Sequence, residues 1–286
     1  MRGVIVPVSE GSTMPFQGVL GGKFGNWLLE QCAAPPAQPH TPAHQSAGTC
    51  VDDTPRLSSL FGERFTLAVK GCMVLDYGCG YGETVVSLAK SDVGTAIGLD
   101  IRESVLEAAR MLARQEEVGE RCLFIDASDT GAMASFKERI DVVVSIDGFE
   151  HYADPGSVLR QMRDLLRPGG TAYISFGPPW WHPYGSHLTF MGVPPWSHVI
   201  FKEETILALR ARYRSDGARR FEDVEGGLNR MTIARFERLV RASGFQVNNL
   251  DLIPIRGTKL LGRNRWGREL FTSIVRASLI KSNRAV

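Results

Sequence analysis

From residue 57 onward, short apolar runs alternate with longer stretches in which apolar residues recur at helical spacing. The runs are rich in β-branched residues, as buried parallel strands are, and lie at residues 73–76, 95–100, 122–126, 141–146 and 171–176. Helical spacing fills the intervals, most clearly at residues 84–90, 104–114 and 154–167. This alternation predicts an α/β fold in which helices cover both faces of a doubly wound, mostly parallel sheet.

Two of the expected helices carry start signals. Ser104 and Glu107 have the spacing of a capping box, which begins a helix by pairing side chains with backbone amides. Asp154 followed by Pro155 is typical of an N-cap and a first helical position, and Pro-Gly-Gly at residues 168–170 is expected to end that helix. These signals indicate where the two helices begin.

The alternation breaks after the fifth run. Residues 177–228 show no clear strand or helix pattern, and this stretch of 52 residues is far longer than an ordinary connection. We therefore expect a lid insertion after strand five. A helix then begins near Thr232 and stops at Gly244, and two more strands are expected at residues 246–253 and 270–279.

The N-terminal part has a different character. Residues 33–56 are rich in Pro, Ala and polar residues without apolar periodicity, which predicts a linker or flexible arm. Before it, residues 14–31 form a short amphipathic segment that is expected to dock on the main domain or on a second subunit, so a homo-oligomer through this segment stays open. The chain thus divides into an N-terminal segment, residues 1–56, and one domain, residues 57–286, that includes the lid.

Composition fits a soluble globular protein, since 43% of the 286 residues are apolar and 22% are charged. No apolar run approaches the roughly 20 residues that span a bilayer, so no transmembrane segment is expected. The N-terminus lacks the apolar core of a signal peptide. The five cysteines are odd in number and show no paired spacing, as is typical of reduced thiols, so we predict a cytoplasmic protein.

Charge is nearly balanced, because 33 basic and 31 acidic side chains give a net charge of +2, and this predicts no nucleic-acid partner. The sum hides an asymmetry, with −7 over residues 1–200 and +9 over residues 201–286. Solvated arginines on exposed helices are the simpler explanation of the basic end, and a face for an anionic substrate or lipid is the alternative.

A glycine-rich turn, D-Y-G-C-G-Y-G at residues 76–82, follows the first expected strand. Glycines there permit unusual backbone angles and a close approach to a ligand. The dinucleotide fingerprint requires a glycine where this chain has Glu83, which disfavours a nicotinamide oxidoreductase. Asp76 would repel a pyrophosphate but attract an ammonium or sulfonium group. The turn therefore favours a ligand with positive charge.

Acidic residues stand at the ends of the following strands. Asp100 ends the second strand and can accept hydrogen bonds from ribose hydroxyls. Asp126 ends the third, where its carboxylate and the N–H of Ala127 can contact an adenine edge, and Asp147 follows the fourth. Because open α/β sheets bind ligands at the carboxyl ends of their strands, this ordered set indicates a ligand site at that edge.

These motifs resemble those of the class I S-adenosylmethionine-dependent methyltransferases, in the order D-Y-G-C-G-Y-G, G-L-D-I, F-I-D-A, D-V-V-V-S-I-D-G-F-E-H and L-R-P-G-G. The resemblance covers roughly residues 57–176, and residues 231–281 are similar to the family's last helix and closing hairpin. F-E-H followed by D-P is most similar to the small-molecule branch, of the type 11/12 kind. The resemblance implies a Rossmann-like sheet of seven strands with an antiparallel last strand, and S-adenosylmethionine as the cofactor.

The resemblance also implies roles by position. The three glycines would lie against the methionyl part of the cofactor, with Asp76 near its amino group, while Asp100 would hold the ribose. Asp126 and Ala127 would contact the adenine, and Ile146 would line the floor near the methyl group. The implied cofactor-binding set is Asp76, Tyr77, Gly78, Cys79, Gly80, Gly82, Asp100, Ile101, Asp126, Ala127, Ile146 and Asp147.

Methyl transfer to a hydroxyl needs a group that removes its proton, so we look for bases near the ends of strands four and five. The candidate catalytic residues are His151, His187, His182 and Glu150. His182 and His187 with Asp147 or Glu150 could also bind a divalent metal, but no spacing among them is diagnostic and no metal is assigned. Aromatic side chains of the lid are the candidates for substrate binding: Trp180, Trp181, Tyr184 and Trp196.

We therefore expect an enzyme that transfers a methyl group from S-adenosylmethionine to a small molecule by in-line displacement, assisted by a His or Glu base. A hydroxyl oxygen of a sugar, an aromatic compound or a secondary metabolite is the favoured acceptor, and nitrogen or carbon of a natural product is the alternative. A non-catalytic cofactor-binding partner subunit also stays open. Macromolecule methylation has only the basic C-terminal third in its favour, because no basic–aromatic nucleic-acid motif is present.

Overall fold

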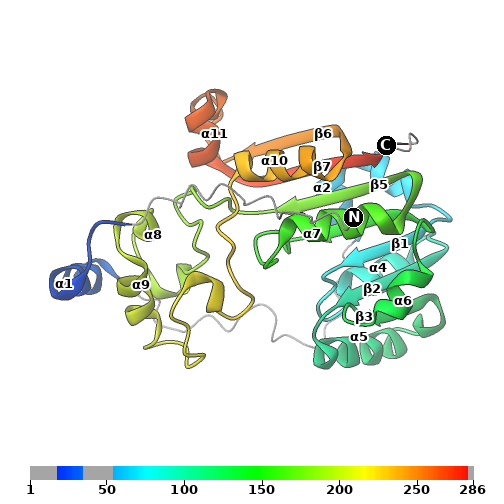
Figure 1. Cartoon of the computed structure of the whole chain (residues 1–286), viewed down its shortest axis with the longest axis horizontal. Coiled ribbons are helices and arrows are strands. Elements are labelled where there is room, and N and C mark those ends of the chain that lie inside the picture. The colour runs from blue at the N-terminus through cyan, green and yellow to red at the C-terminus, as the bar shows by residue number, and fades with distance from the viewer. Residues whose placement is uncertain (1–17, 35–53, 283–286) are drawn as a thin grey trace, which may run out of the picture.

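A seven-stranded sheet forms the centre of the molecule (Figure 1). The computed structural model describes residues 18–34 and 54–282. The strand order is β3-β2-β1-β4-β5-β7-β6, and β7 runs antiparallel to both of its neighbours. The strands are β1 Met73–Tyr77, β2 Thr95–Asp100, β3 Cys122–Asp126, β4 Ile140–Ile146, β5 Leu166–Phe176, β6 Phe245–Pro254 and β7 Thr272–Lys281. The expected doubly wound sheet with an antiparallel last strand is confirmed.

Helices cover both faces of this sheet, and each face has its own apolar core. One core joins the sheet to α2 Thr54–Phe61, α3 Glu63–Ala68, α4 Glu83–Lys90 and α5 Glu103–Gln115. The other joins it to α7 Pro155–Leu165 and α10 Ile233–Ser243, with the short α6 Thr130–Ser135 at its margin. The central strands are apolar on both sides because both faces are buried, which explains their continuous apolar runs.

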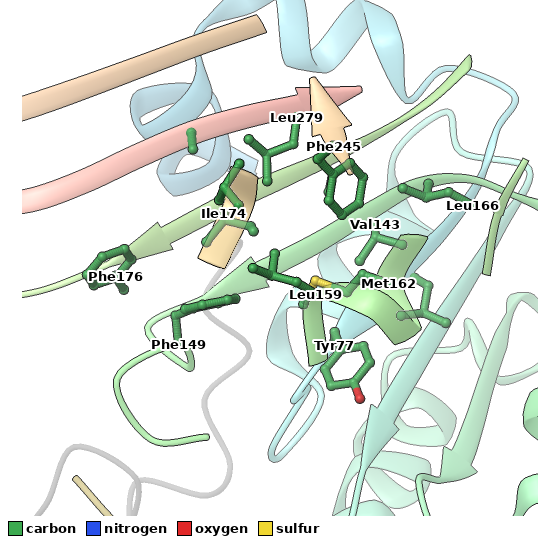
Figure 2. Packing of buried hydrophobic residues seen from close by; sticks show 14 of the residues in the cluster. Tyr77, Val143, Phe149, Leu159, Met162, Leu166, Ile174, Phe176, Phe245 and Leu279 are labelled. Atoms are coloured by element: carbon green, nitrogen blue, oxygen red, sulfur yellow. The ribbon is translucent and has the colours of Figure 1, made fainter. Parts of the chain in front are cut away.

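The core beside α7 and α10 also anchors the ends of two strands. Figure 2 shows Phe149, just beyond β4, close to Phe176 at the end of β5, and their ring centroids are 6.0 Å apart. Both rings are fully buried, and both pack against Phe236 of α10. The chain on either side of these rings is therefore held firmly at the carboxyl edge of the sheet.

Helix caps confirm two of the expected starts and correct a third. Asp154 accepts a hydrogen bond from the Ser157 amide at 2.9 Å, and Thr232 caps α10. Ser104 does not begin α5 as a capping box, because α5 starts one residue earlier, with Arg102 at the N-cap. A contact in the turn before the helix decides this boundary, since the Arg102 amide donates to the carboxylate of Asp100, two residues earlier, at 3.0 Å.

Two strand boundaries also differ from the expectation. The helix before β5 ends at Leu165 instead of residue 167, and β5 begins at Leu166 and includes the Pro-Gly-Gly segment. The strand expected at 270–279 begins at residue 272, because α11 Arg265–Phe271 precedes it. Glu269 of this helix accepts hydrogen bonds from the amides of Ile233 and Ala234, so α11 helps to begin α10.

The insertion after β5 forms a lobe beside the sheet, at the left of Figure 1. It contains α8 Ser197–Ile200 and α9 Glu203–Arg210 and has an apolar cluster of its own. The helix α1 Gly22–Cys32 packs on α9 and places Leu29 in this cluster. The expected amphipathic segment therefore docks on the chain's own insertion. Of the expected arm, residues 35–53 lie outside the described residues, and residues 54–56 begin α2.

Candidate active site

The glycine turn between β1 and α4 is left-handed at three positions. Gly78, Gly80 and Gly82 have φ angles of 82°, 52° and 85°. A Cβ atom on Gly82 would lie 2.6 Å from the Cβ of Ala109, so α5 packs directly against the turn. A Cβ on Gly80 would meet no atom of the described chain within 4 Å. The turn is thus closed toward α5 and open on the side of Gly80, where a ligand can approach the backbone.

Two buried carboxylates, Asp76 and Asp100, flank this turn, with exposed fractions of 4% and 7%. Asp100 accepts hydrogen bonds from the Gly80 amide at 3.0 Å and from the Arg102 side chain, whose Nε lies 3.2 Å away. The Arg102 side chain is 56% exposed, so ribose hydroxyls can take its place on the carboxylate. The sequence analysis did not single out Arg102.

Three other residues of the expected cofactor set have different surroundings. The Tyr77 hydroxyl donates to Gln161 of α7, and burial raises the pKa of Tyr77 to about 12. Cys79 is buried under the turn, where burial and the nearby Asp76 and Asp100 carboxylates hold the pKa of its thiol well above the usual range. Ile101 is 73% exposed beside Asp100. Tyr77 and Cys79 therefore stabilise the turn through their buried side chains.

The end of β3 carries the two residues expected to contact the adenine. The Ala127 amide donates to the carbonyl of Asp100 at 2.9 Å, so this N–H is paired within the chain, and its adenine contact stays a prediction. The Asp126 carboxylate accepts from the amide and the hydroxyl of Ser128, both at 2.7 Å, and these bonds lower its pKa. Asp126 thus stays ionised and partly exposed at the strand end.

At the end of β4, Ile146 is half-buried and Asp147 turns the chain with a left-handed φ of 51°. The Asp147 amide donates to Ser175 of β5 at 2.8 Å, which keeps the two strand ends together. The Asp147 carboxylate forms an ion pair with Arg56 of α2. This contact brings α2 over the carboxyl edge of the sheet, and the sequence analysis had placed Arg56 in the arm.

Directly beyond β4, the structure brings together three of the four candidate catalytic residues. Glu150, His151 and His187 each offer one ligand atom, and these atoms all lie within 4.8 Å of one another. The imidazole centroids are 5.6 Å apart. Glu150 is 4% exposed and accepts a hydrogen bond from the Gly177 amide at 3.2 Å. We call these three residues the carboxylate–imidazole cluster.

Backbone carbonyls fix the proton positions on both imidazoles of the cluster. Nδ1 of His151 donates to the carbonyl of Gly227 at 2.6 Å, which in the neutral ring places the lone pair on Nε2. Nε2 of His187 donates to the carbonyl of Pro178 at 3.3 Å, which leaves the lone pair on Nδ1. Burial raises the pKa of Glu150 to about 8 and lowers the pKa of His187 to about 4.

The segment E-G-G-L-N at residues 225–229 holds the cluster in place. Gly226 and Gly227 are both left-handed, with φ of 84° and 68°, and this turn aims the Gly227 carbonyl at His151. The Asn229 side chain donates to the carbonyls of Phe149 and Tyr152 at 2.8 and 2.7 Å, on either side of Glu150 and His151. The sequence analysis did not single out this segment, although its paired glycines and asparagine are a signal that could have found it.

The remaining candidates lie outside the cluster. Nδ1 of His182 accepts a hydrogen bond from the Tyr184 amide at 3.1 Å, and burial lowers the pKa of His182. Trp180 is 3% exposed and packs on Phe221 inside the insertion, which corrects its expected role in the wall of a substrate pocket. The other three aromatic candidates are at least partly exposed: Trp181, Tyr184 and Trp196.

Comparison with known proteins agrees with this geometry. Residues 68–177 match the family model described as a methyltransferase domain. Over 121 residues the chain is 34% identical to a protein named ubiquinone biosynthesis O-methyltransferase from Proteus mirabilis (strain HI4320). That match covers 42% of this chain and 44% of the relative, so the chain matches less than half of the relative's length.

Solved structures show the same fold at low sequence identity. An S-adenosylmethionine dependent methyltransferase from Mesorhizobium loti has a TM-score of 0.51 at 16% identity, over 80% of this chain and 98% of that one. The cyclase SpnF has a TM-score of 0.52 at 15% identity, over 79% of this chain and 80% of that one. In the part of the chain that the structure describes, every helix is too short or too polar to cross a bilayer. The motif order, the sheet topology and the family model agree: residues 68–177 match a methyltransferase domain, and the fold is that of the class I S-adenosylmethionine-dependent methyltransferases.

Proposed function

We propose that the chain transfers the methyl group of S-adenosylmethionine to a hydroxyl oxygen of a small molecule. The observation that carries this proposal is the adjacency of two sets of groups on one sheet edge. The open glycine turn with its buried carboxylates suits a cationic nucleoside, and the carboxylate–imidazole cluster follows directly on β4, the strand next to β1. The name of the Proteus mirabilis relative, an O-methyltransferase, favours oxygen as the acceptor atom.

The residues present fit the cofactor. The backbone at Gly80 is open to a ligand, and Asp100 and Asp76 place negative charge where a ribose and an ammonium group would bind. Asp126 offers its carboxylate to the adenine, while the Ala127 amide would have to leave the Asp100 carbonyl to contribute. When bound, S-adenosylmethionine supplies an electrophilic methyl group, from which the acceptor oxygen displaces the sulfur together with the electron pair of the C–S bond.

The chain's own task is to orient the hydroxyl and to favour the loss of its proton. The lone pairs of His151 and His187 and the carboxyl group of Glu150 form one polar region, and a hydroxyl that contacts it can give up its proton there. The insertion lies beside this edge and carries His187, so we propose that it acts as the substrate lid of a single methyltransferase domain spanning residues 57–286. Trp181, Tyr184 and Trp196 are then the aromatic groups available to an acceptor.

We also propose that the protein works in the cytoplasm. The described cysteines, Cys32, Cys72, Cys79 and Cys122, are free thiols, as a reducing compartment would keep them. Cys50 lies outside the described residues. Thiol oxidation in cells can be measured by alkylation before and after reduction. We expect these four thiols to be reduced, and a disulfide among them would argue for an oxidising compartment.

A binding experiment tests the cofactor half of the proposal. Isothermal titration of the wild-type chain should show one S-adenosylmethionine per chain. Asp100→Asn should weaken this binding about 10- to 100-fold, because hydrogen bonds to a charged group contribute about 1.5–3 kcal/mol. Asp92→Asn is the matched control, since Asp92 is exposed and pairs only with the exposed Lys70 in the described structure. Equal affinities of all three proteins would rule out the proposed cofactor site.

A further inference from the structure

The carboxylate–imidazole cluster has the donor set of a metal site, and we propose that Glu150, His151 and His187 bind a first-row divalent cation such as Zn²⁺ or Co²⁺. This inference deepens the proposed function, because the cation would lie on the acceptor side of the same site. Its binding, however, is independent of the acceptor's identity and can be measured without turnover.

The first argument comes from Glu150. One carboxylate oxygen, Oε1, accepts the Gly177 amide, whereas the buried Oε2 has no hydrogen-bond partner among the described residues. The side chain is 4% exposed, so water does not readily satisfy this atom. Ionisation of a carboxyl group is costly when one of its oxygens is buried without a partner. A cation bound to Oε2 would remove that cost and keep the carboxylate ionised.

The second argument comes from the imidazoles. A histidine that binds a metal almost always donates its other ring N–H to a carbonyl or a carboxylate, which orients the ring and fixes its tautomer. Both cluster histidines show this arrangement, through the carbonyls of Gly227 and Pro178. The two supporting bonds come from different segments of the chain, so each ring is oriented separately and each lone pair is presented by a defined nitrogen.

The third argument comes from distance and donor type. The three ligand atoms lie within 4.8 Å of one another, while donors bound to one zinc ion at about 2.0–2.2 Å are about 3.0–3.5 Å apart. Movements of at most about 2 Å, within reach of side-chain torsions, therefore close the site. Two imidazoles and one carboxylate suit Zn²⁺, Co²⁺ or Fe²⁺, whereas Mg²⁺ and Ca²⁺ prefer oxygen ligands only.

The position of this site gives the cation a defined role. Three protein ligands leave a coordination position open, as catalytic zinc sites do. A bound divalent cation lowers the pKa of a coordinated water from 15.7 to about 7, and it acts on a hydroxyl in the same sense. The acceptor class that such a site selects is a small molecule whose hydroxyl oxygen can bind the cation. The proton then leaves to solvent, and neither imidazole has to act as the base.

Cobalt absorption spectroscopy on the full chain tests the proposal. The chain is treated with a chelator, dialysed and titrated with Co²⁺, and we expect one ion per chain with visible d–d bands. Ligation by nitrogen and oxygen gives no thiolate-to-metal band in the near ultraviolet, which separates this site from the exposed Cys32. His187→Asn should weaken Co²⁺ binding at least about 100-fold, since removal of even a supporting residue costs 10- to 100-fold. Asparagine tolerates the left-handed φ of 58° at this position.

Two controls keep the outcomes separate. His182→Asn removes a histidine of the same segment that lies outside the cluster, and this variant should bind Co²⁺ like the wild type. Absence of stoichiometric Co²⁺ binding by the wild type, a thiolate band, or equal affinity of His187→Asn would each overturn the metal site. If S-adenosylmethionine still binds and the chelator-treated chain still transfers methyl groups, only the metal site fails. If S-adenosylmethionine does not bind at all, the proposed function fails while a Co²⁺ site can still be present.

Discussion

Alanine substitutions at three left-handed glycines separate the stability of the cofactor turn from its binding role. Gly71, Gly80 and Gly82 all have positive φ, so an alanine Cβ costs about 1–2 kcal/mol of folding free energy at each. The lower entropy of the unfolded alanine chain offsets about 0.4–1 kcal/mol of that cost. Gly71 and Gly80 have nothing within 4 Å of the added Cβ, so we expect a net loss of about 1 kcal/mol at both.

Gly82→Ala should destabilise the protein more, for a reason that the structure makes explicit. The new Cβ would lie 2.6 Å from the Cβ of Ala109 and 3.1 Å from the Phe124 ring, so α5 must shift. Overpacking of this kind costs about 1–3 kcal/mol, which brings the expected loss to about 2–4 kcal/mol. Urea unfolding followed by circular dichroism measures these differences from the midpoints at constant slope.

The affinity for S-adenosylmethionine should rank the same variants in a different order from their stability. Gly80→Ala places a methyl group on the open side of the turn, so we expect its affinity to fall at least about 10-fold, which corresponds to about 1.4 kcal/mol. Gly71 lies before β1, at the opposite end of that strand, and Gly71→Ala should bind the cofactor like the wild type. If Gly80→Ala bound as tightly as Gly71→Ala, the open side of Gly80 would not be where the cofactor approaches.

Other contacts give further expectations. Asn229→Ala removes two hydrogen bonds to the carbonyls of Phe149 and Tyr152, so we expect a stability loss of about 1–3 kcal/mol together with a lower kcat at nearly unchanged S-adenosylmethionine affinity. A loss of stability with unchanged kcat would contradict its positioning role. Arg210 is buried and pairs with Asp216, and this contact lowers the pKa of the Asp216 carboxyl group. The pair therefore stabilises the fold fully above the unfolded pKa of about 3.9. This stabilisation is lost as pH falls through the lower pKa of the folded state. Asp216→Asn should therefore cost about 1.5–3 kcal/mol at neutral pH and progressively less in acid, and a pH-independent difference in urea midpoint would count against this explanation.

The central sheet was predictable because local patterns and burial agree along its strands. The five apolar runs predicted the five parallel strands β1 to β5, and the acidic residues at the ends of β1 to β4 lie at one edge as expected. Asp154 and Thr232 begin helices where their side chains indicated, because a helix cap depends only on residues within one turn. Local rules sufficed for these elements.

The differences arise where the deciding contact is absent from the expected motif or comes from a distant part of the chain. The start of α5 depends on Asp100 holding the Arg102 amide, which a capping-box pattern around Ser104 does not contain. Trp180 is buried in the insertion, where it belongs to the apolar cluster of that lobe. The sequence of this segment shows no periodicity that separates core residues from surface residues. Arg56 looked like part of a flexible arm, yet α2 brings it to Asp147 across 91 positions of the chain.

The carboxylate–imidazole cluster was predictable from the sequence in part, and the rest depends on contacts between distant segments. Glu150 and His151 were predictable as neighbours beyond β4, since their place in the chain follows from the strand pattern. His187 comes to them through the folding of the insertion, and the Gly227 carbonyl arrives from a third segment. Residue type alone therefore selected four candidates, and only the fold separated His182 from the other three.

Transfer of a labelled methyl group tests the central claim most directly. The purified chain is incubated with S-adenosylmethionine carrying a trideuterated methyl group and with a panel of hydroxylated small molecules, and the products are analysed by mass spectrometry and NMR. We predict a product in which one hydroxyl hydrogen is replaced by the labelled methyl group, and a much lower yield with Asp100→Asn than with Asp92→Asn. A label found on nitrogen or carbon, or cofactor binding without any transfer across the panel, would contradict the proposed O-methylation.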